Sequence, residues 1–143
     1  TANERQTDKI TKDRISQICS FLRQDHIFHL DRLLLTRKHA EASLFIADLV
    51  KQGESSLAIL GLLARHCRNA IRVQQNLNSR RPIGMGLKLP QAVLKSYNGY
   101  VGRSSGYKFE RALRLCQDVD AAIKSTGSAR DISLLTQIIT LLS

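Results

Sequence analysis

Apolar residues in this chain recur every three or four positions, which is the spacing of one face of an α-helix. The clearest stripe runs through Phe109, Ala112, Cys116, Val119 and Ile123. Stripes of the same kind predict helices over about 11–22, 25–34, 38–52, 55–79, 90–101, 107–125 and 130–142. No segment alternates apolar and polar residues over the length of a β-strand. We therefore expect an all-α fold, a compact helical bundle of about six to seven helices.

Several residues predict where these helices begin and end. Asp25 has a short side chain that accepts hydrogen bonds from backbone N–H groups, so it is an expected N-cap. Gly53 is a natural C-terminal stop, and Pro90 suits the first turn of a helix. Residues 80–90, with the sequence RRPIGMGLKLP, contain two glycines and two prolines and are expected to form a loop. A Gly/Ser-rich break at 102–106 should separate the next two helices.

The formal net charge of the chain is +10, and the whole excess lies in one block. Residues 1–54 and 110–143 contain nearly equal numbers of basic and acidic residues. Residues 55–109 contain nine Lys and Arg residues and no Asp or Glu. Such a block raises the local concentration of a polyanion or of an acidic protein surface.

Five arginines in this block are the candidate contact residues. Arg65, Arg68 and Arg72 share a face of the predicted fourth helix that differs from its apolar face, and Arg80 and Arg81 open the following loop. One interpretation is an interface that binds nucleic-acid backbone or an acidic partner protein. The other is a solvated helical face that keeps the protein soluble. Composition alone supports these two interpretations about equally.

Other polar residues give only weak indications of chemistry. His26 and His29 are three positions apart on a predicted helix, but a metal site would need further ligands of suitable type. His66 and Cys67 are adjacent, and adjacent residues on a helix do not face each other, so an activated thiol is not indicated. Residues 84–86 lack the Lys-Ser/Thr pair of a phosphate-binding loop and are expected to form a plain turn. We therefore expect no catalytic residues, no cofactor and no metal.

The cysteines and the hydropathy of the chain indicate the cellular compartment of the protein. The chain has three cysteines, Cys19, Cys67 and Cys116, which is an odd number without metal-ligand spacing. Each lies among apolar residues, so we expect buried free thiols in a reducing compartment. No apolar stretch approaches the roughly 18 residues that a membrane span needs. The sequence therefore predicts a cytoplasmic protein with no membrane contact.

Short motifs along the chain follow an order that is similar to that of a known family. The most informative stretch is a helix that ends in Gly53-Glu54, followed by an Ile-Leu helix that carries Arg65 and Arg68. In chain order the motifs are Ile10-Thr11-x-Asp13-x-Ile15, Ile27-Phe28-His29-Leu30-Asp31, Ala42…Leu49-Val50-x-x-Gly53-Glu54, Ile59-Leu60-x-Leu62-Leu63-Ala64-Arg65-x-x-Arg68, Pro90…Val93, Phe109-x-x-Ala112-Leu113 and Asp120-x-x-x-Lys124-x-x-Gly127. Over residues 8–142 the chain resembles the C-terminal part of the delta subunit of the bacterial DNA polymerase III clamp loader.

This resemblance implies a domain organisation and a non-catalytic role. Residues 1–22 would be the end of a preceding lid-type domain or its last helix, and residues 23–143 would form a helical collar domain. The collar would pack against the equivalent domains of the other clamp-loader subunits, so its role would be assembly. The sliding clamp would be contacted by an AAA+-like module upstream of Thr1, which in this family lacks a working ATP site. The parent protein would then be a subunit of the DNA polymerase III holoenzyme, a DNA-directed DNA polymerase.

The resemblance also changes the interpretation of the basic block. Arginine is favoured at protein interfaces, so Arg65, Arg68 and Arg72 would belong to a packing face. Contact of this face with DNA in the complete loader is a second hypothesis. The residues alone leave two other functions open. One is a freestanding helical nucleic-acid-binding module that uses the basic face for phosphates, and the other is a helical adaptor with an acidic protein partner.

Overall fold

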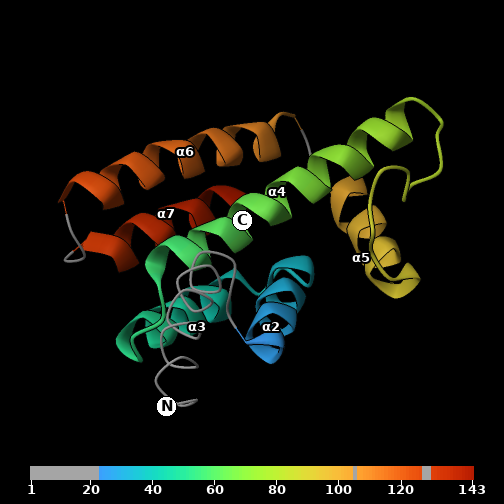
Figure 1. The fold of residues 1–143 in the computed structure, drawn as a ribbon. Coiled ribbons are helices and arrows are strands. Elements are labelled where there is room, and N and C mark those ends of the chain that lie inside the picture. The colour runs from blue at the N-terminus through green and yellow to red at the C-terminus, as the bar shows by residue number, and fades with distance from the viewer. Residues whose placement is uncertain (1–22, 105, 127–129) are drawn as a thin grey trace, which may run out of the picture.

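Six α-helices build the part of the chain that the structure describes, and no β-strand occurs in it (Figure 1). The computed structural model describes residues 23–104, 106–126 and 130–143. Its helices are α2 (Gln24–Leu35), α3 (His39–Lys51), α4 (Ser56–Asn78), α5 (Gln91–Gly102), α6 (Lys108–Thr126) and α7 (Asp131–Leu142). The all-α prediction is confirmed, and these helices lie close to the predicted ranges. The helix predicted over 11–22 falls outside the described residues.

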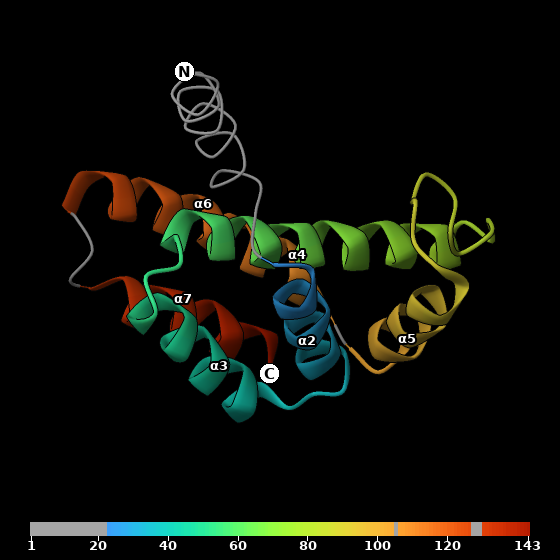
Figure 2. The same ribbon diagram turned by 60° about the horizontal axis from the view of Figure 1, so that its bottom comes forward.

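The longest helix, α4, forms the centre of the bundle. Apolar residues recur at three- and four-residue intervals over its 23 residues, so one broad face is buried along its whole length. This helix packs against α5, α6 and α7. Figures 1 and 2 show α6 and α7 beside its N-terminal half and α5 beside its C-terminal half. On the other side of α7 lies α3, which also packs against α2.

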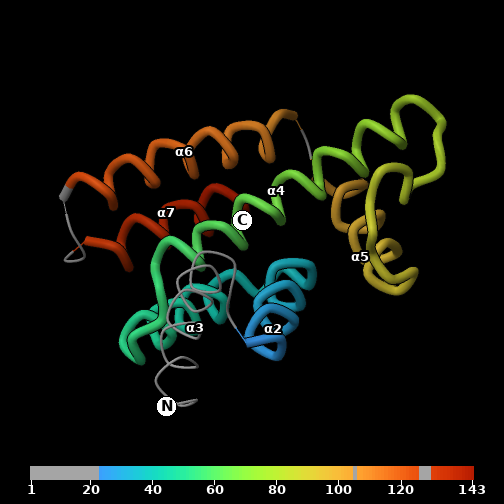
Figure 3. The backbone as a smooth tube through the Cα atoms, viewed as in Figure 1, coloured from blue at the N-terminus to red at the C-terminus, as the bar shows by residue number. Residues whose placement is uncertain are grey.

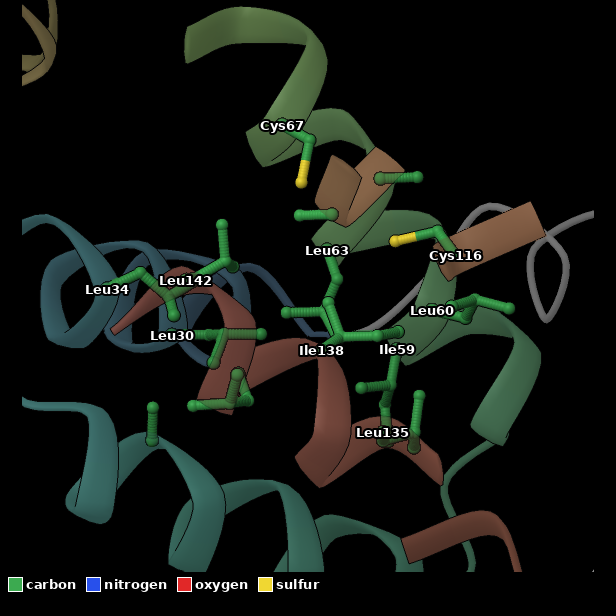
Figure 4. Close-up of a cluster of buried hydrophobic side chains, with 14 of the residues drawn as sticks. Leu30, Leu34, Ile59, Leu60, Leu63, Cys67, Cys116, Leu135, Ile138 and Leu142 are labelled. Atoms are coloured by element: carbon green, nitrogen blue, oxygen red, sulfur yellow. The ribbon is translucent and has the colours of Figure 1, made fainter. Parts of the chain in front are cut away.

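The hydrophobic core lies where α2, α3, α4, α6 and α7 meet (Figure 4). Leu30 and Leu34 of α2 gather there with Leu63 of α4 and with Ile138 and Leu142 of α7. All five side chains are almost fully buried. Burial of one such side chain contributes roughly 1.5–3 kcal/mol to folding. The apolar stripes predicted from the sequence are therefore the surfaces that hold the helices together.

Three helices end in the same hydrogen-bonded turn, and α3 shows it most simply. The Glu54 N–H donates to the Leu49 carbonyl and the Gly53 N–H donates to the Val50 carbonyl, both at 3.0 Å. Gly53 has a φ of 92°, in the left-handed region that glycine enters without a steric penalty. The predicted stop at Gly53 is confirmed.

At the ends of α2 and α4, arginine takes the position that glycine has in α3. The φ angles are 61° for Arg37 and 55° for Arg80, a conformation that costs a residue with a Cβ about 1 kcal/mol or more. The Arg37 guanidinium donates to the Tyr100 carbonyl and to Ser104 Oγ, both at 3.4 Å, and its Cζ lies 5.5 Å from the centroid of the Tyr100 ring. These contacts offset the strain and tie the end of α2 to α5.

Two of the predicted helix starts differ from the structure. The prediction that Asp25 caps α2 is wrong, because Arg23 occupies the N-cap position and Asp25 lies in the first turn. There its carboxylate lies near the positive end of the helix dipole and pairs with the Arg23 guanidinium at 3.2 Å. Pro90 is the N-cap of α5 and not its first residue, because its ψ of 151° is extended. At the start of α4 the Ser55 hydroxyl accepts a hydrogen bond from the Ala58 N–H at 3.2 Å.

The loop that connects α4 to α5 folds back against the end of α4, as the backbone tube shows (Figure 3). The Met85 N–H donates to the Pro82 carbonyl at 3.0 Å, so the prediction of a plain turn at 84–86 is confirmed. The Asn76 side chain is fully buried, and its Nδ2 donates to the carbonyls of Ile83 and Met85, both at 3.0 Å. The side-chain amide of Asn76 therefore holds the middle of the loop against α4.

Replacement of Asn76 with Leu, which is similar in size and cannot donate a hydrogen bond, is expected to destabilise the fold by about 1–2 kcal/mol. The two loop carbonyls would lose their donor while the loop remained close to α4. Thermal unfolding followed by circular dichroism measures the loss, and amide hydrogen exchange at 83–87 should become faster. Gln75→Leu on the exposed neighbour is the control. Equal melting temperatures for the two variants would contradict this account of the loop.

Candidate functional site on the basic surface

The side of α4 that faces away from the core carries three of the predicted contact residues. Arg65, Arg68 and Arg72 are exposed, whereas Cys67 and Ala70 between them are buried. Arg65 and Arg72 lie two helical turns apart, about 10 Å along the helix axis. The structure therefore places these three guanidinium groups on the solvent side of the central helix.

The other two predicted contact residues lie at the C-terminal end of α4. Arg80 and Arg81 are exposed and follow the helix after Ser79. The Arg81 backbone N–H donates to the Asn76 carbonyl at 2.8 Å, and its guanidinium lies 3.5 Å from Ser79 Oγ. All five arginines lie on α4 or directly after it and are called the basic edge below, and they do not line one common pocket.

Each arginine on the body of α4 borders a different feature. Arg65 lines a groove shared with α2 and the start of α5. Arg68 lines a smaller hollow of about 320 Å³ between α4 and α6. The Arg72 guanidinium lies against the loop, because a Cβ added to Gly86 would be only 3.6 Å from its Cζ. The basic edge therefore has a hollow on each side.

The larger hollow, called the α2–α5 groove below, has a volume of about 590 Å³. It lies between α2, Arg65 of α4, the end of the loop and the first half of α5. The described part of its wall combines apolar and basic side chains with one carboxylate. The lining residues are Gln24, Phe28, Asp31, Arg32, Leu35, Thr36, Arg65, Lys88, Leu89, Pro90, Ala92, Val93 and Ser96.

Among the described residues that line the α2–α5 groove, Asp31 is the one acidic side chain. Burial raises the pKa of this carboxyl to about 6, and the nearby Arg65 guanidinium lowers it by a smaller amount. Among the described residues Asp31 makes no salt bridge and no side-chain hydrogen bond. A half-buried carboxylate that makes no direct contact of this kind with the described residues is costly to the fold, and such groups mark candidate interaction sites.

Next to the groove, a buried histidine joins α4 to α5. His66 Nδ1 lies 3.2 Å from the Tyr97 hydroxyl and Nε2 lies 3.2 Å from the Tyr100 hydroxyl. Asn69 Nδ2 also donates to the Tyr97 hydroxyl at 3.4 Å. A neutral ring has one donor and one acceptor, so both hydroxyls can be satisfied at once. Burial lowers the pKa of His66 to about 3, which keeps the ring neutral at physiological pH.

The remaining residues that suggested chemistry have structural explanations. His26 and His29 both pack edge-on against the Phe45 ring, with centroid distances of 5.8 and 4.6 Å. Within the described ranges, no three His, Cys, Asp or Glu residues come together as a metal site would require. Cys67 and Cys116 are buried free thiols, as expected, and the hydrogen bond between them together with burial raises the pKa of Cys67. Cys19 lies outside the described residues.

Sequence reasoning found the basic edge but missed the α2–α5 groove. Phe28, Asp31, Lys88 and Val93 come from three separate segments, and no spacing rule brings such segments together. One local signal was available, because Asp31 interrupts the otherwise apolar stripe of α2. A charged residue within an apolar stripe conflicts with the local pattern, and such conflicts are expected at functional or strained sites.

Fold and surface together define an all-helical domain whose distinctive feature is a basic edge on its central helix, flanked by an apolar groove. A model of the family described as DNA polymerase III delta subunit, C-terminal domain, matches residues 24–141. The match covers most of the chain, which therefore belongs to this family. The delta subunit is a non-catalytic component of the DNA polymerase III clamp loader, so the chain is part of the DNA replication machinery.

Neither the curated proteins nor the solved structures contain a match to this chain. None of the helices in the described ranges has the length and hydropathy to span a membrane.

Proposed function

We propose that this chain is the collar domain through which a clamp-loader delta subunit packs against the equivalent domains of the other loader subunits. The observation that carries the proposal is the family match over 24–141, which coincides with the described helical bundle. A packing domain needs helices with surface left over for neighbours. The exposed side of α4 and the hollows on both sides of it supply such surface.

The proposal includes a domain boundary near residue 23. Residues 23–143 would form the collar, and the match from residue 24 onwards supports this start. Residues 1–22 would be the end of a preceding lid-type domain or its last helix, and they lie outside the described residues. Contact with the sliding clamp would come from another module of the parent protein. The compartment we propose is the cytoplasm, where the replication machinery of a bacterium works.

Co-purification tests the proposal. The tagged chain is expressed with each of the other clamp-loader subunits and recovered by affinity capture and size-exclusion chromatography. We expect a stoichiometric complex with at least one loader subunit and none with the catalytic polymerase subunit, which is the control. Capture of the folded chain without any loader subunit would refute the assembly role.

DNA contact by the basic edge is the second candidate function. The observation that favours it is the run of nine basic and no acidic residues over 55–109, with Arg65, Arg68 and Arg72 exposed on one helix. For the isolated chain we expect weak, sequence-independent binding to a duplex. Dissociation constants for the duplex, measured at several salt concentrations, distinguish DNA binding from assembly. Tight binding at physiological salt, with a salt slope that falls by about one for each arginine changed to Ala, would favour this function over assembly.

A further inference from the structure

The α2–α5 groove presents apolar surface that the bundle does not cover. Phe28 is 52% exposed although it lies on α2 beside the core, and Val93 and Leu89 are only partly buried. Arg37 fixes one end of the groove, because its guanidinium bonds to the Tyr100 carbonyl and to Ser104. The groove is therefore a preformed apolar surface, with a volume typical of binding pockets, about 300–1,000 Å³.

Charge around the groove favours an acidic occupant. Of the described residues in its lining, three are exposed cations, Arg32, Arg65 and Lys88, and one is an acid, Asp31. Lys95 on the exposed side of α5 adds a fourth cation close to the start of that helix. Apolar walls with a cationic rim match an amphipathic helix that has acidic residues beside its apolar face.

We propose that the α2–α5 groove docks an amphipathic α-helix of a neighbouring clamp-loader subunit, with its apolar face against Phe28 and Val93 and its acidic flank facing Arg65 and Lys88. This inference rests on the proposed assembly function and names the surface and the kind of partner segment. In this proposal Arg65 has a specific role, as a residue of the docking site. Arg80 and Arg81 lie outside the groove lining and have no part in it.

A change at Asp31 can test whether the docked helix is acidic or basic. Its carboxylate would repel the acidic flank of the docked helix and attract a basic one. Asp31→Asn keeps the size of the side chain and removes the charge. An acidic occupant is therefore bound more tightly by this variant, and a basic occupant less tightly.

The experiment measures the dissociation constant of this chain for the loader subunit with which it co-purifies, by biolayer interferometry at physiological salt. Arg65→Glu with Lys88→Glu should weaken binding roughly tenfold or more, and Phe28→Ser about fivefold. Asp31→Asn should tighten binding about threefold. Arg111→Glu with Arg114→Glu on the exposed side of α6 is the matched control, because the net charge changes equally away from the groove. Each variant is first checked for an unchanged helical circular dichroism spectrum.

The outcomes separate the groove from the assembly function. If the unmodified chain binds a loader subunit and the groove variants bind as the α6 control does, the groove inference is wrong and the assembly function stands. If no loader subunit binds the unmodified chain, both are wrong. Weaker binding by Asp31→Asn would overturn the acidic occupant. Duplex DNA bound by the Arg65 and Lys88 site with no effect of Phe28→Ser would replace the helix with a phosphate backbone.

Discussion

Replacement of Leu63 with Ala is expected to destabilise the fold by about 3 kcal/mol, within the 2–5 kcal/mol range typical of such changes. Leu63 is fully buried in the N-terminal half of α4 and lies in the cluster formed with α2 and α7 (Figure 4). The missing atoms would leave a cavity that helices from three sides cannot close. Because domains of this size are stable by only about 5–15 kcal/mol, the variant would lose a large part of the total.

Urea unfolding followed by circular dichroism measures this loss. Leu44→Ala is the control, because Leu44 is the same residue type but is 68% exposed on α3. We expect the control to change the free energy of unfolding by less than about 0.5 kcal/mol. Similar values for the two variants would show that α4 is not the centre of the core.

Acidification is expected to destabilise the fold through His66, by up to about 1.4 kcal/mol for each pH unit between 6.5 and 3. Burial lowers the folded-state pKa of His66 from 6.5 to about 3, so the unfolded chain takes up a proton that the folded chain does not. Stability from this group is therefore complete above pH 6.5 and falls as the pH drops. The protonated ring could no longer accept a hydrogen bond from either tyrosine.

Acidification stabilises the fold through Asp31 over part of the same pH range. Its folded-state pKa is raised from 3.8 to about 6, so the folded chain takes up this proton first as the pH falls. Stability from Asp31 is complete below pH 3.8 and is lost as the pH rises through 6. Between these two values the contributions of His66 and Asp31 largely cancel, and the unmodified chain should show little pH dependence from the pair.

Two variants separate these contributions. Asp31→Asn should be more stable than the unmodified chain at pH 7.5, and the advantage should shrink as the pH falls to 4.5. The advantage of the unmodified chain over His66→Gln should shrink over the same range, because only the unmodified chain has the buried histidine to protonate. Urea unfolding across a pH series measures both differences. If neither difference changes with pH, these two groups do not have the pKa values that their burial implies.

The helices could be predicted from the sequence because a single buried stripe determines each of them. The stripe of α6 and the Gly53 turn after α3 are examples, since each depends on residues a few positions apart. The Asp25 cap failed because a carboxylate in the first turn of a helix is stabilised nearly as well as one at the cap. The local pattern of apolar residues therefore predicted the helices. The exact residues at which they begin depended on small differences in free energy between neighbouring positions.

The candidate site was predictable only in part. The spacing of Arg65, Arg68 and Arg72 on the sequence predicted an exposed face, and the structure places all three in solvent. Their different neighbours could not be predicted, because these depend on how α2, α5 and α6 pack around α4. The partial burial of Asp31 near Arg65 is likewise a property of tertiary packing.

Competition with the intact delta subunit tests the central claim most directly. The clamp loader is assembled from its full-length subunits in the presence of increasing amounts of this chain, and its composition is measured by native mass spectrometry. If the chain is the assembly domain, it should take the place of full-length delta, and the intact loader should disappear as the chain approaches saturation. A loader that keeps full-length delta in the presence of saturating, folded chain would contradict the account.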